Sequence, residues 1–122
     1  MRVMIDTTVF LAECLLPTQK YPRLMRKIVA GHKLVFSEGQ LEEIRSLIAE
    51  YFPNECDTVE LFLSRFSFET AESTEDRQEG YPFLSDARAA GVDAVITLDP
   101  DMAGTVTDGI RFMSPDSFLN GD

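Results

Sequence analysis

Residues 2–10 read RVMIDTTVF, and this stretch decides the class of fold. A short apolar run, Arg2–Ile5, ends abruptly at Asp6. The residues that follow predict a helix, capped by either Thr7 or Thr8. A strand that passes directly into a helix begins the alternation from which parallel sheets are built.

The same alternation continues to the end of the chain. Strands are expected at residues 33–36 (KLVF), 66–70 (FSFET), 94–97 (AVIT) and 110–113 (IRFM). Helices are expected at residues 22–30, 37–52, 57–66 and 82–90, with an acidic loop at 71–80 and a closing turn at 114–119. Ser37 and Gln40 have capping-box spacing, as do Asp57 and Glu60. This pattern predicts an α/β fold, a three-layer α/β/α sandwich around a mostly parallel sheet, with residues 1–122 as a single domain.

Length, composition and charge narrow the class of protein. A chain of 122 residues has room for about one domain, and 44% hydrophobic with 26% charged residues is typical of globular proteins. No apolar run is long enough to cross a bilayer and the N-terminus does not resemble a secretory signal, which predicts a soluble, cytoplasmic protein without a membrane partner. The net charge of −10 repels nucleic acid, so binding it would need a local basic patch and a bridging cation.

Cysteine and histidine chemistry has little support in the sequence. Cys14 and Cys56 lie far apart, and His32 is the single histidine, so these residues cannot supply a zinc framework. A Ser/His/Asp site would depend on His32 alone, in a stretch that looks like a connection. The carboxylates are the better candidates for chemistry.

Acidic residues follow two of the predicted strands. Asp6 ends the first, and Asp99 follows the strand at 94–97 with Asp101 close behind. The carboxyl ends of parallel strands form the edge where sites develop. Either aspartate alone is better explained as a cap, whereas for the two together a cap and a site explain the pattern equally well. Glu43 adjoins the apolar stripe of its helix, where a solvated helix face is the alternative. Converging carboxylates without His or Cys favour Mg²⁺ or Mn²⁺, which could activate water against a phosphodiester.

Four segments in order along the chain resemble PIN domains: MIDTTVF (4–10), LVFSEGQLEEIRSLI (34–48), AAGVDAVITLDPDM (89–102) and GIRFMSPDSFL (109–119). This resemblance spans nearly the whole chain. It implies an α/β/α sandwich that holds Mg²⁺ or Mn²⁺ with three or four acids and cleaves RNA. It also implies similarity to VapC-like ribonuclease toxins of toxin–antitoxin modules, which are often homodimers blocked by an antitoxin.

Carried over to this chain, the resemblance implies three catalytic acids that also bind metal: Asp6, Glu43 and Asp99. Asp101 would be an auxiliary metal-binding acid. Thr7 and Thr97 would be polar groups that support the ligands.

The family's remaining acid is missing from its usual place, where Gly80 or Tyr81 stands. Glu79 is the favoured catalytic substitute, and Asp76 and Asp86 are the alternatives. These departures leave a second function open, in which the chain is a catalytically degenerate PIN-like module that binds or regulates.

The expected substrate is single-stranded RNA or tRNA. Arg23, Arg26 and Lys27 belong to a basic stretch that could bind RNA phosphates, although an ordinary charged helix face explains them as well. A phosphatase of the haloacid-dehalogenase type is a third hypothesis. It would need a second acid two residues after Asp6, where Thr8 stands.

Overall fold

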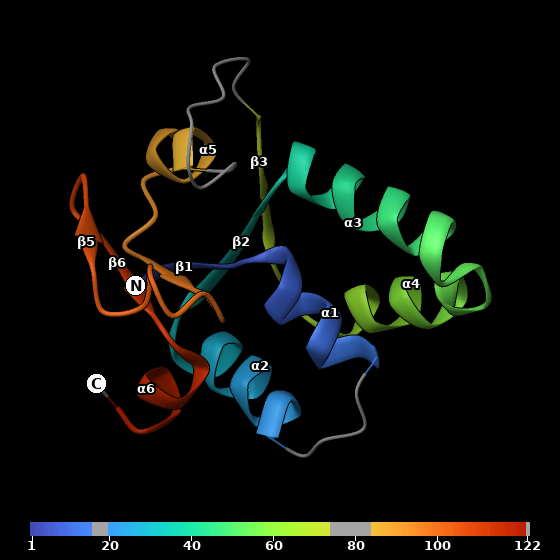
Figure 1. Cartoon of the computed structure of the whole chain (residues 1–122), viewed down its shortest axis with the longest axis horizontal. Coiled ribbons are helices and arrows are strands. Elements are labelled where there is room, and N and C mark those ends of the chain that lie inside the picture. Colours follow the sequence, from blue (N-terminus) through green and yellow to red (C-terminus); the bar gives the residue numbers. More distant parts are fainter. Residues whose placement is uncertain (16–19, 74–83, 122) are drawn as a thin grey trace.

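The computed structural model describes residues 1–15, 20–73 and 84–121, and within them six strands form one sheet. The strands are β1 (Arg2–Ile5), β2 (Lys33–Ser37), β3 (Glu69–Ala71), β4 (Ala94–Ile96), β5 (Val106–Thr107) and β6 (Ile110–Met113). Their order across the sheet is β3-β2-β1-β4-β6-β5, and every neighbouring pair is parallel except β5 with β6 (Figure 1). The mostly parallel α/β fold expected from the sequence is confirmed.

Helices connect most of these strands. They are α1 (Thr7–Leu15), α2 (Lys20–Gly31), α3 (Glu38–Tyr51), α4 (Cys56–Arg65), α5 (Leu84–Ala89) and α6 (Pro115–Leu119), with a single 3-10 turn η1 (Pro53–Glu55) between α3 and α4. The start of α3 is as expected, because the Ser37 side chain accepts a hydrogen bond from the Gln40 backbone N–H at 3.2 Å. Among these described helices, none has the length and apolar content needed to span a bilayer.

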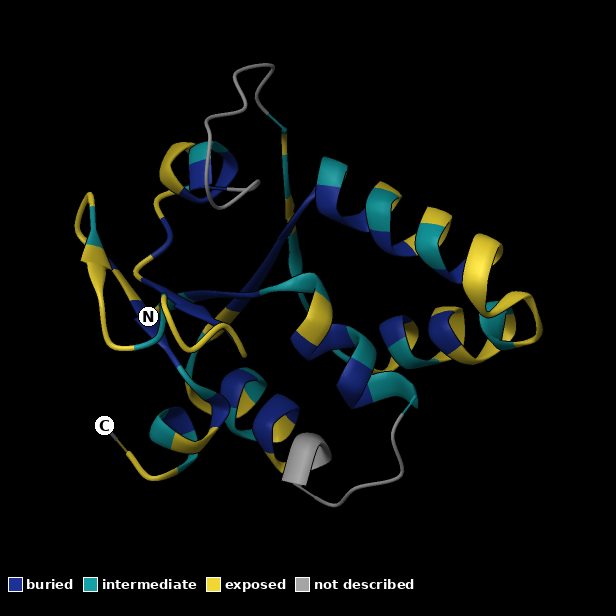
Figure 2. Cartoon of the chain, viewed as in Figure 1, coloured by how far each residue is buried: buried dark blue, intermediate teal, exposed yellow. Residues whose placement is uncertain are grey.

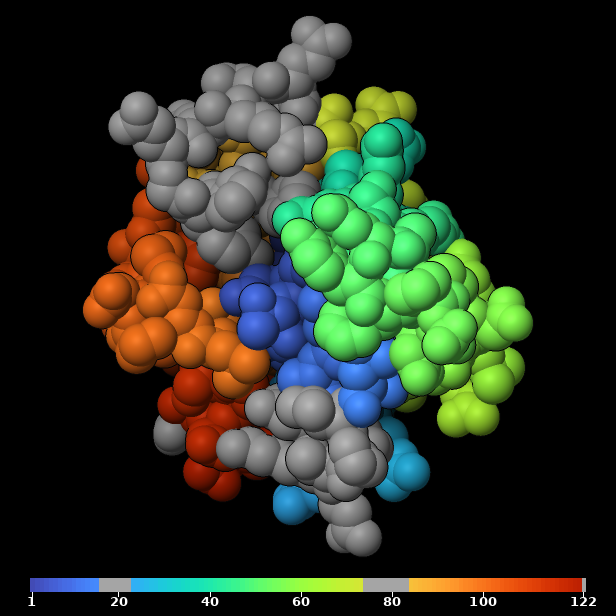
Figure 3. Space-filling model, turned by 45° about the vertical axis from the view of Figure 1, so that its right-hand side comes forward, coloured from blue at the N-terminus to red at the C-terminus, as the bar shows by residue number. Residues whose placement is uncertain are grey.

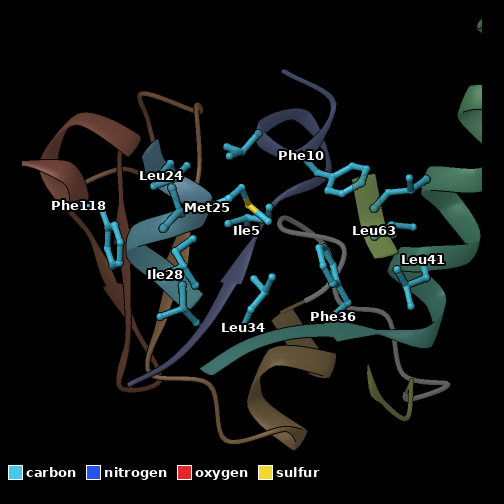
Figure 4. Packing of buried hydrophobic residues seen from close by; sticks show 14 of the residues in the cluster. Ile5, Phe10, Leu24, Met25, Ile28, Leu34, Phe36, Leu41, Leu63 and Phe118 are labelled. Atoms are coloured by element: carbon cyan, nitrogen blue, oxygen red, sulfur yellow. The ribbon is translucent and has the colours of Figure 1, made fainter. Parts of the chain in front are cut away.

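The sheet is buried because its side chains alternate between two separate cores. Val3 and Ile5 of β1 join the larger core, which is filled from α1, α2, α3, α4 and α6 (Figure 4). Met4, between them, joins a second core on the opposite face, where Leu84 and Ala87 of α5 pack. Figure 2 shows the consequence, with β1 and the greater part of β2 buried between helices. These two cores confirm the three-layer sandwich.

Two of the expected helix caps are wrong. Helix α1 already begins at Thr7, and its cap is Asp6, whose Oδ1 accepts a hydrogen bond from the Val9 backbone N–H at 3.1 Å. Helix α4 begins at Cys56, so Asp57 lies inside the first turn and the capping-box prediction fails there. The Glu60 carboxylate instead accepts a hydrogen bond from Arg45 Nε of α3 at 2.9 Å.

Other boundaries shift by a few residues. Helix α2 begins at Lys20 rather than at residue 22, and β3 covers Glu69–Ala71 rather than residues 66–70. The antiparallel strand β5 was not expected. It forms because Asp108 and Gly109 both adopt positive φ angles, 54° and 80°, as the two central residues of a tight hairpin turn require.

Strand β1 lies at the point where the chain reverses its direction across the sheet. From β1 the chain adds β2 and then β3 on one side, and it returns to add β4, β6 and β5 on the other. Helices that leave neighbouring strands in opposite directions leave a crevice at the carboxyl ends of the strands between them. In this sheet the crevice lies beyond β1 and β4, where Asp6 and Asp99 follow.

Candidate functional site

Asp6 is held rigidly at the end of β1. Its backbone N–H donates to the Ile96 carbonyl of β4 at 2.9 Å, which continues the parallel ladder by one residue. Its Oδ1 caps α1, and its Oδ2 accepts a hydrogen bond from Thr97 Oγ1 at 2.6 Å. Both oxygens of this half-buried carboxylate therefore have a fixed orientation at the sheet edge.

Thr97 joins the two aspartates. It is fully buried, and its hydroxyl oxygen donates to Asp6 and also accepts a hydrogen bond from the Asp99 backbone N–H at 3.1 Å. The Thr97 hydroxyl, which bonds to Asp6 91 positions earlier in the chain, therefore also holds the Asp99 backbone in place. The structure places the Thr97 hydroxyl between the Asp6 carboxylate and the Asp99 backbone, and the roles of all three residues stay predictions.

Asp99 and Asp101 belong to the exposed turn after β4. The Asp99 Oδ1 atom accepts a hydrogen bond from the Asp101 backbone N–H at 2.9 Å, so this carboxylate orders its own turn. Both residues are exposed. The capping interpretation of Asp99 and the ligand interpretation are compatible, because one carboxylate oxygen makes the turn and the other is available.

Glu43 turns toward the interior, whereas its neighbour Glu42 is exposed. The Glu43 Oε2 atom is buried and has no hydrogen-bond partner among the described residues. A buried carboxylate oxygen without a protein partner costs several kcal/mol unless an ion, a water or a ligand pairs with it. One oxygen of Glu43 therefore lies inside the protein, and its role as a metal ligand stays a prediction.

Two further buried oxygens near Asp6 have no hydrogen-bond partner among the described residues. One is Thr7 Oγ1, in the first turn of α1. The other is Gln40 Oε1, which lies one helical turn before Glu43 on α3. The sequence pattern assigned Gln40 only to the helix cap, and its side chain was missed as a member of this site. Because the capping signal of Ser37 and Gln40 already accounted for Gln40, no contact between its side chain and the sheet was expected.

The oxygen atoms of these side chains are possible ligands of a metal ion. Among residues 1–15, 20–73 and 84–121, no three Asp, Glu, His or Cys side chains lie close enough to hold an ion between them. Mg²⁺, however, is usually held by only one or two carboxylates and keeps several waters. The carboxylates of Asp6 and Glu43 are the type of donor that this requires, and Glu43 has a buried oxygen without a partner among the described residues.

Three acidic residues were predicted as replacements for the missing acid. Glu79 and Asp76 lie outside the described residues. Asp86 is buried in α5, and its Oδ2 accepts a hydrogen bond from Ser73 Oγ at 3.0 Å. The same Ser73 oxygen accepts from the Gly39 backbone N–H at 2.5 Å, so Asp86 ties α5 to the start of α3.

The predicted RNA-binding residues share α2 but differ in their surroundings. Arg23 and Arg26 are exposed. Lys27 is half-buried, its ammonium donates to the Phe118 carbonyl, and it lies 4.9 Å from the centre of the Phe118 ring. Lys27 therefore anchors α6 on α2, and a role for all three in RNA binding stays a prediction.

A hollow on the surface leads to this part of the sheet edge. Figure 3 shows the beginning of the chain at its floor, between α3 and the segment that follows β4. Beside it lies an apolar groove of about 520 Å³, lined by residues of α1 together with Phe52 and Leu98. Both of these side chains are exposed, so the groove is a surface that a partner could cover.

Glu13 is a second unusual carboxyl, on the inner side of α1. It is only 4% exposed, and its Oε1 accepts a hydrogen bond from the Met25 backbone N–H at 3.2 Å, while Oε2 has no partner. Burial raises the pKa of Glu13 to about 8, and the hydrogen bond from Met25 lowers it by less. Burial also raises the pKa of the neighbouring Cys14 thiol to about 12, so this cysteine is not a reactive nucleophile.

Comparison with known proteins supports the fold. No protein-family model matches this sequence. No curated protein is significantly similar to it. Among solved structures, the chain is similar to one in the crystal structure of VapBC2 from Rickettsia felis bound to a DNA fragment from their promoter. The TM-score is 0.73 over 93% of this chain and 98% of that chain, at 13% identity, so the likeness shows the PIN-like fold of VapC and no more.

Proposed function

We propose that this chain is a metal-dependent endoribonuclease that cleaves single-stranded RNA, as the toxin of a toxin–antitoxin module. The observation that carries the proposal is the buried Oε2 of Glu43, which has no hydrogen-bond partner among the described residues and belongs to the helix whose Gln40 bonds to Ile5, the residue before Asp6. The PIN-like fold supports it, because PIN domains form a nuclease toxin family. The VapBC2 likeness supports an antitoxin partner, for which the apolar groove beside α1 is the proposed surface.

In this proposal each residue has a defined task. Asp6 and Glu43 would hold Mg²⁺ or Mn²⁺, which would supply an activated water and neutralise phosphate charge. Thr97 fixes the rotamer of Asp6, and Asp99 adds negative charge on the β4 side. Glu79 is the proposed fourth acid, and Arg23 with Arg26 is the proposed contact for phosphates outside the cleaved bond.

The decisive experiment compares the wild type with Asp6→Asn on single-stranded RNA and tRNA, with Mn²⁺ and with chelator. Asparagine caps a helix as well as aspartate, so the variant should fold. The matched control is Asp57→Asn, an exposed aspartate in the first turn of α4. We expect cleavage by the wild type and the control, and at least about a hundredfold less from Asp6→Asn, as loss of a metal ligand implies. Equal cleavage by Asp6→Asn would refute the proposed site.

A degenerate binding module is the second candidate function. It is favoured by the departure from the family pattern, since Gly80 or Tyr81 stands where the remaining acid is usual. Thermal unfolding with and without Mn²⁺ separates the two functions. An upward shift with Mn²⁺ supports the nuclease, because a ligand that binds the native state stabilises it. No shift, together with no cleavage, supports the degenerate module.

The homodimer that the resemblance implies is also a proposal. The exposed apolar side chains Phe52 and Leu98 beside α1 offer a surface for it as well as for an antitoxin. Sedimentation of the isolated chain distinguishes these uses, because a groove covered by a second copy gives a concentration-dependent dimer.

A further inference from the structure

Gln40 occupies the place where two central strands separate. The pairing of β1 with β2 ends at Val3 and Leu34, while β1 continues to Ile5. The Gln40 amide fills the opening, and its Nε2 donates to the Ile5 carbonyl at 2.5 Å. The side chain is 1% exposed, so this glutamine is a built-in part of the sheet edge.

The hydrogen bond to Ile5 fixes which way the amide faces. A carbonyl can only accept, so the Gln40 atom beside it must be the nitrogen. The other end is then Oε1, a pure acceptor, and it is buried without a partner. If Gln40 only closed the gap between the strands, its Oε1 atom would be buried without a hydrogen bond, at a cost of about 1–3 kcal/mol of stability.

The unpartnered atoms around it share one chemistry. Glu43 Oε2 follows one turn later on α3, and Thr7 Oγ1 lies two residues beyond Ile5. Oxygens that can accept hydrogen bonds suit a hydrated cation, since Mg²⁺ keeps several waters whose hydrogens all point outward. A bare ion bound by carboxylates alone would not need an amide oxygen at this place.

We propose that Gln40 is a positioning residue that accepts a hydrogen bond from a water on the divalent cation held at Asp6 and Glu43. This inference rests on the proposed function. Gln40 Oε1 then contacts the ion through this water. Gln40 Nε2 holds the Ile5 carbonyl, and with it the backbone before Asp6, against α3. Carboxylates and amides in such supporting places typically change metal affinity by about 10–100-fold.

The test measures Mn²⁺ affinity directly, from free Mn²⁺ by electron paramagnetic resonance, in the wild type and in Gln40→Leu. Leucine keeps much of the buried volume and removes both polar ends. The matched control is Ile44→Val, a fully buried site on α3 without polar contacts, which costs about 0.5–1.5 kcal/mol of stability. We expect at least about tenfold weaker Mn²⁺ binding in Gln40→Leu and unchanged affinity in the control.

A second variant serves if Gln40→Leu does not fold. Gln40→Met has nearly the length of glutamine and also lacks the Oε1 acceptor, so we expect at least about tenfold weaker Mn²⁺ binding from it as well. Unchanged Mn²⁺ affinity in a folded Gln40→Leu or Gln40→Met overturns the role of Gln40 while RNA cleavage by the wild type still stands. A wild type that binds no Mn²⁺ and cleaves no RNA overturns the proposed function and this inference with it.

Discussion

Replacement of Glu13 by glutamine should abolish most of the pH dependence of stability between about pH 5 and pH 8. The pKa of this buried carboxyl is about 8 in the folded chain, against 4.5 for an ordinary glutamate. The folded state therefore keeps a proton that the unfolded state releases. Stability is fully present below pH 4.5 and is lost as the pH rises through the folded pKa.

The magnitude follows from the two pKa values. Each pH unit between them costs about 1.4 kcal/mol, so the wild type should lose at most about 4 kcal/mol of unfolding free energy between pH 5 and pH 8. That is a large part of the roughly 5–15 kcal/mol typical of a domain. Glutamine keeps the shape and an acceptor for the Met25 N–H without a charge, so the variant should overtake the wild type above neutral pH.

The assay is urea unfolding of both proteins at the two pH values. His32 titrates in the same window, but its pKa is lowered by burial, by the N-terminal amine and by Lys27, which makes stability rise with pH. The difference between the wild type and Glu13→Gln cancels this opposite contribution. An equal fall in both proteins would show that Glu13 is ionised in the folded chain and would refute the reasoning.

Two other substitutions test contacts that hold the sheet edge and the last helix. Thr97→Val removes the hydroxyl that bonds the Asp6 carboxylate, and we expect a loss of about 1.5–3 kcal/mol in urea unfolding, as for other hydrogen bonds to charged groups. Lys27→Met keeps the packing on Phe118 but loses the hydrogen bond to its carbonyl, so we expect about 1 kcal/mol less stability and faster amide exchange in α6. Unchanged unfolding in the first variant, or unchanged exchange in the second, would contradict these contacts.

The sequence predicted the parts of this fold that depend on apolar periodicity. Arg2–Ile5 and Ile110–Met113 are strands with the expected bounds, because a short apolar run closed by a polar residue has few other structures. The proximity of Asp6 and Thr97 could be predicted, since the carboxyl ends of neighbouring parallel strands lie at one edge of the sheet. Tertiary contacts, in contrast, override local signals, as at Asp57, whose helix begins two residues earlier than its capping pattern indicates.

Other features depend on what a residue meets far along the chain. Gln40 fits a capping box, and only the separation of β1 from β2 explains why its amide turns to Ile5 instead. The burial of Glu13 depends on α2 packing over it, which no local pattern shows. The β5–β6 hairpin is different, because it was not expected although Asp108–Gly109 is a strong local signal for a two-residue turn.

The joining of Asp6 to Thr97 also sets the order in which a growing chain can acquire its site. Asp6 and Glu43 leave the ribosome early, but β4 must pair with β1 before the hydroxyl of Thr97 can reach Asp6, and β4 is in turn paired with β6. Contacts of such long sequence separation form late in folding, because the loop entropy must be lost first. A nascent chain that ends within α5 therefore contains Asp6 and Glu43 but lacks the hydroxyl of Thr97 that orients the Asp6 carboxylate.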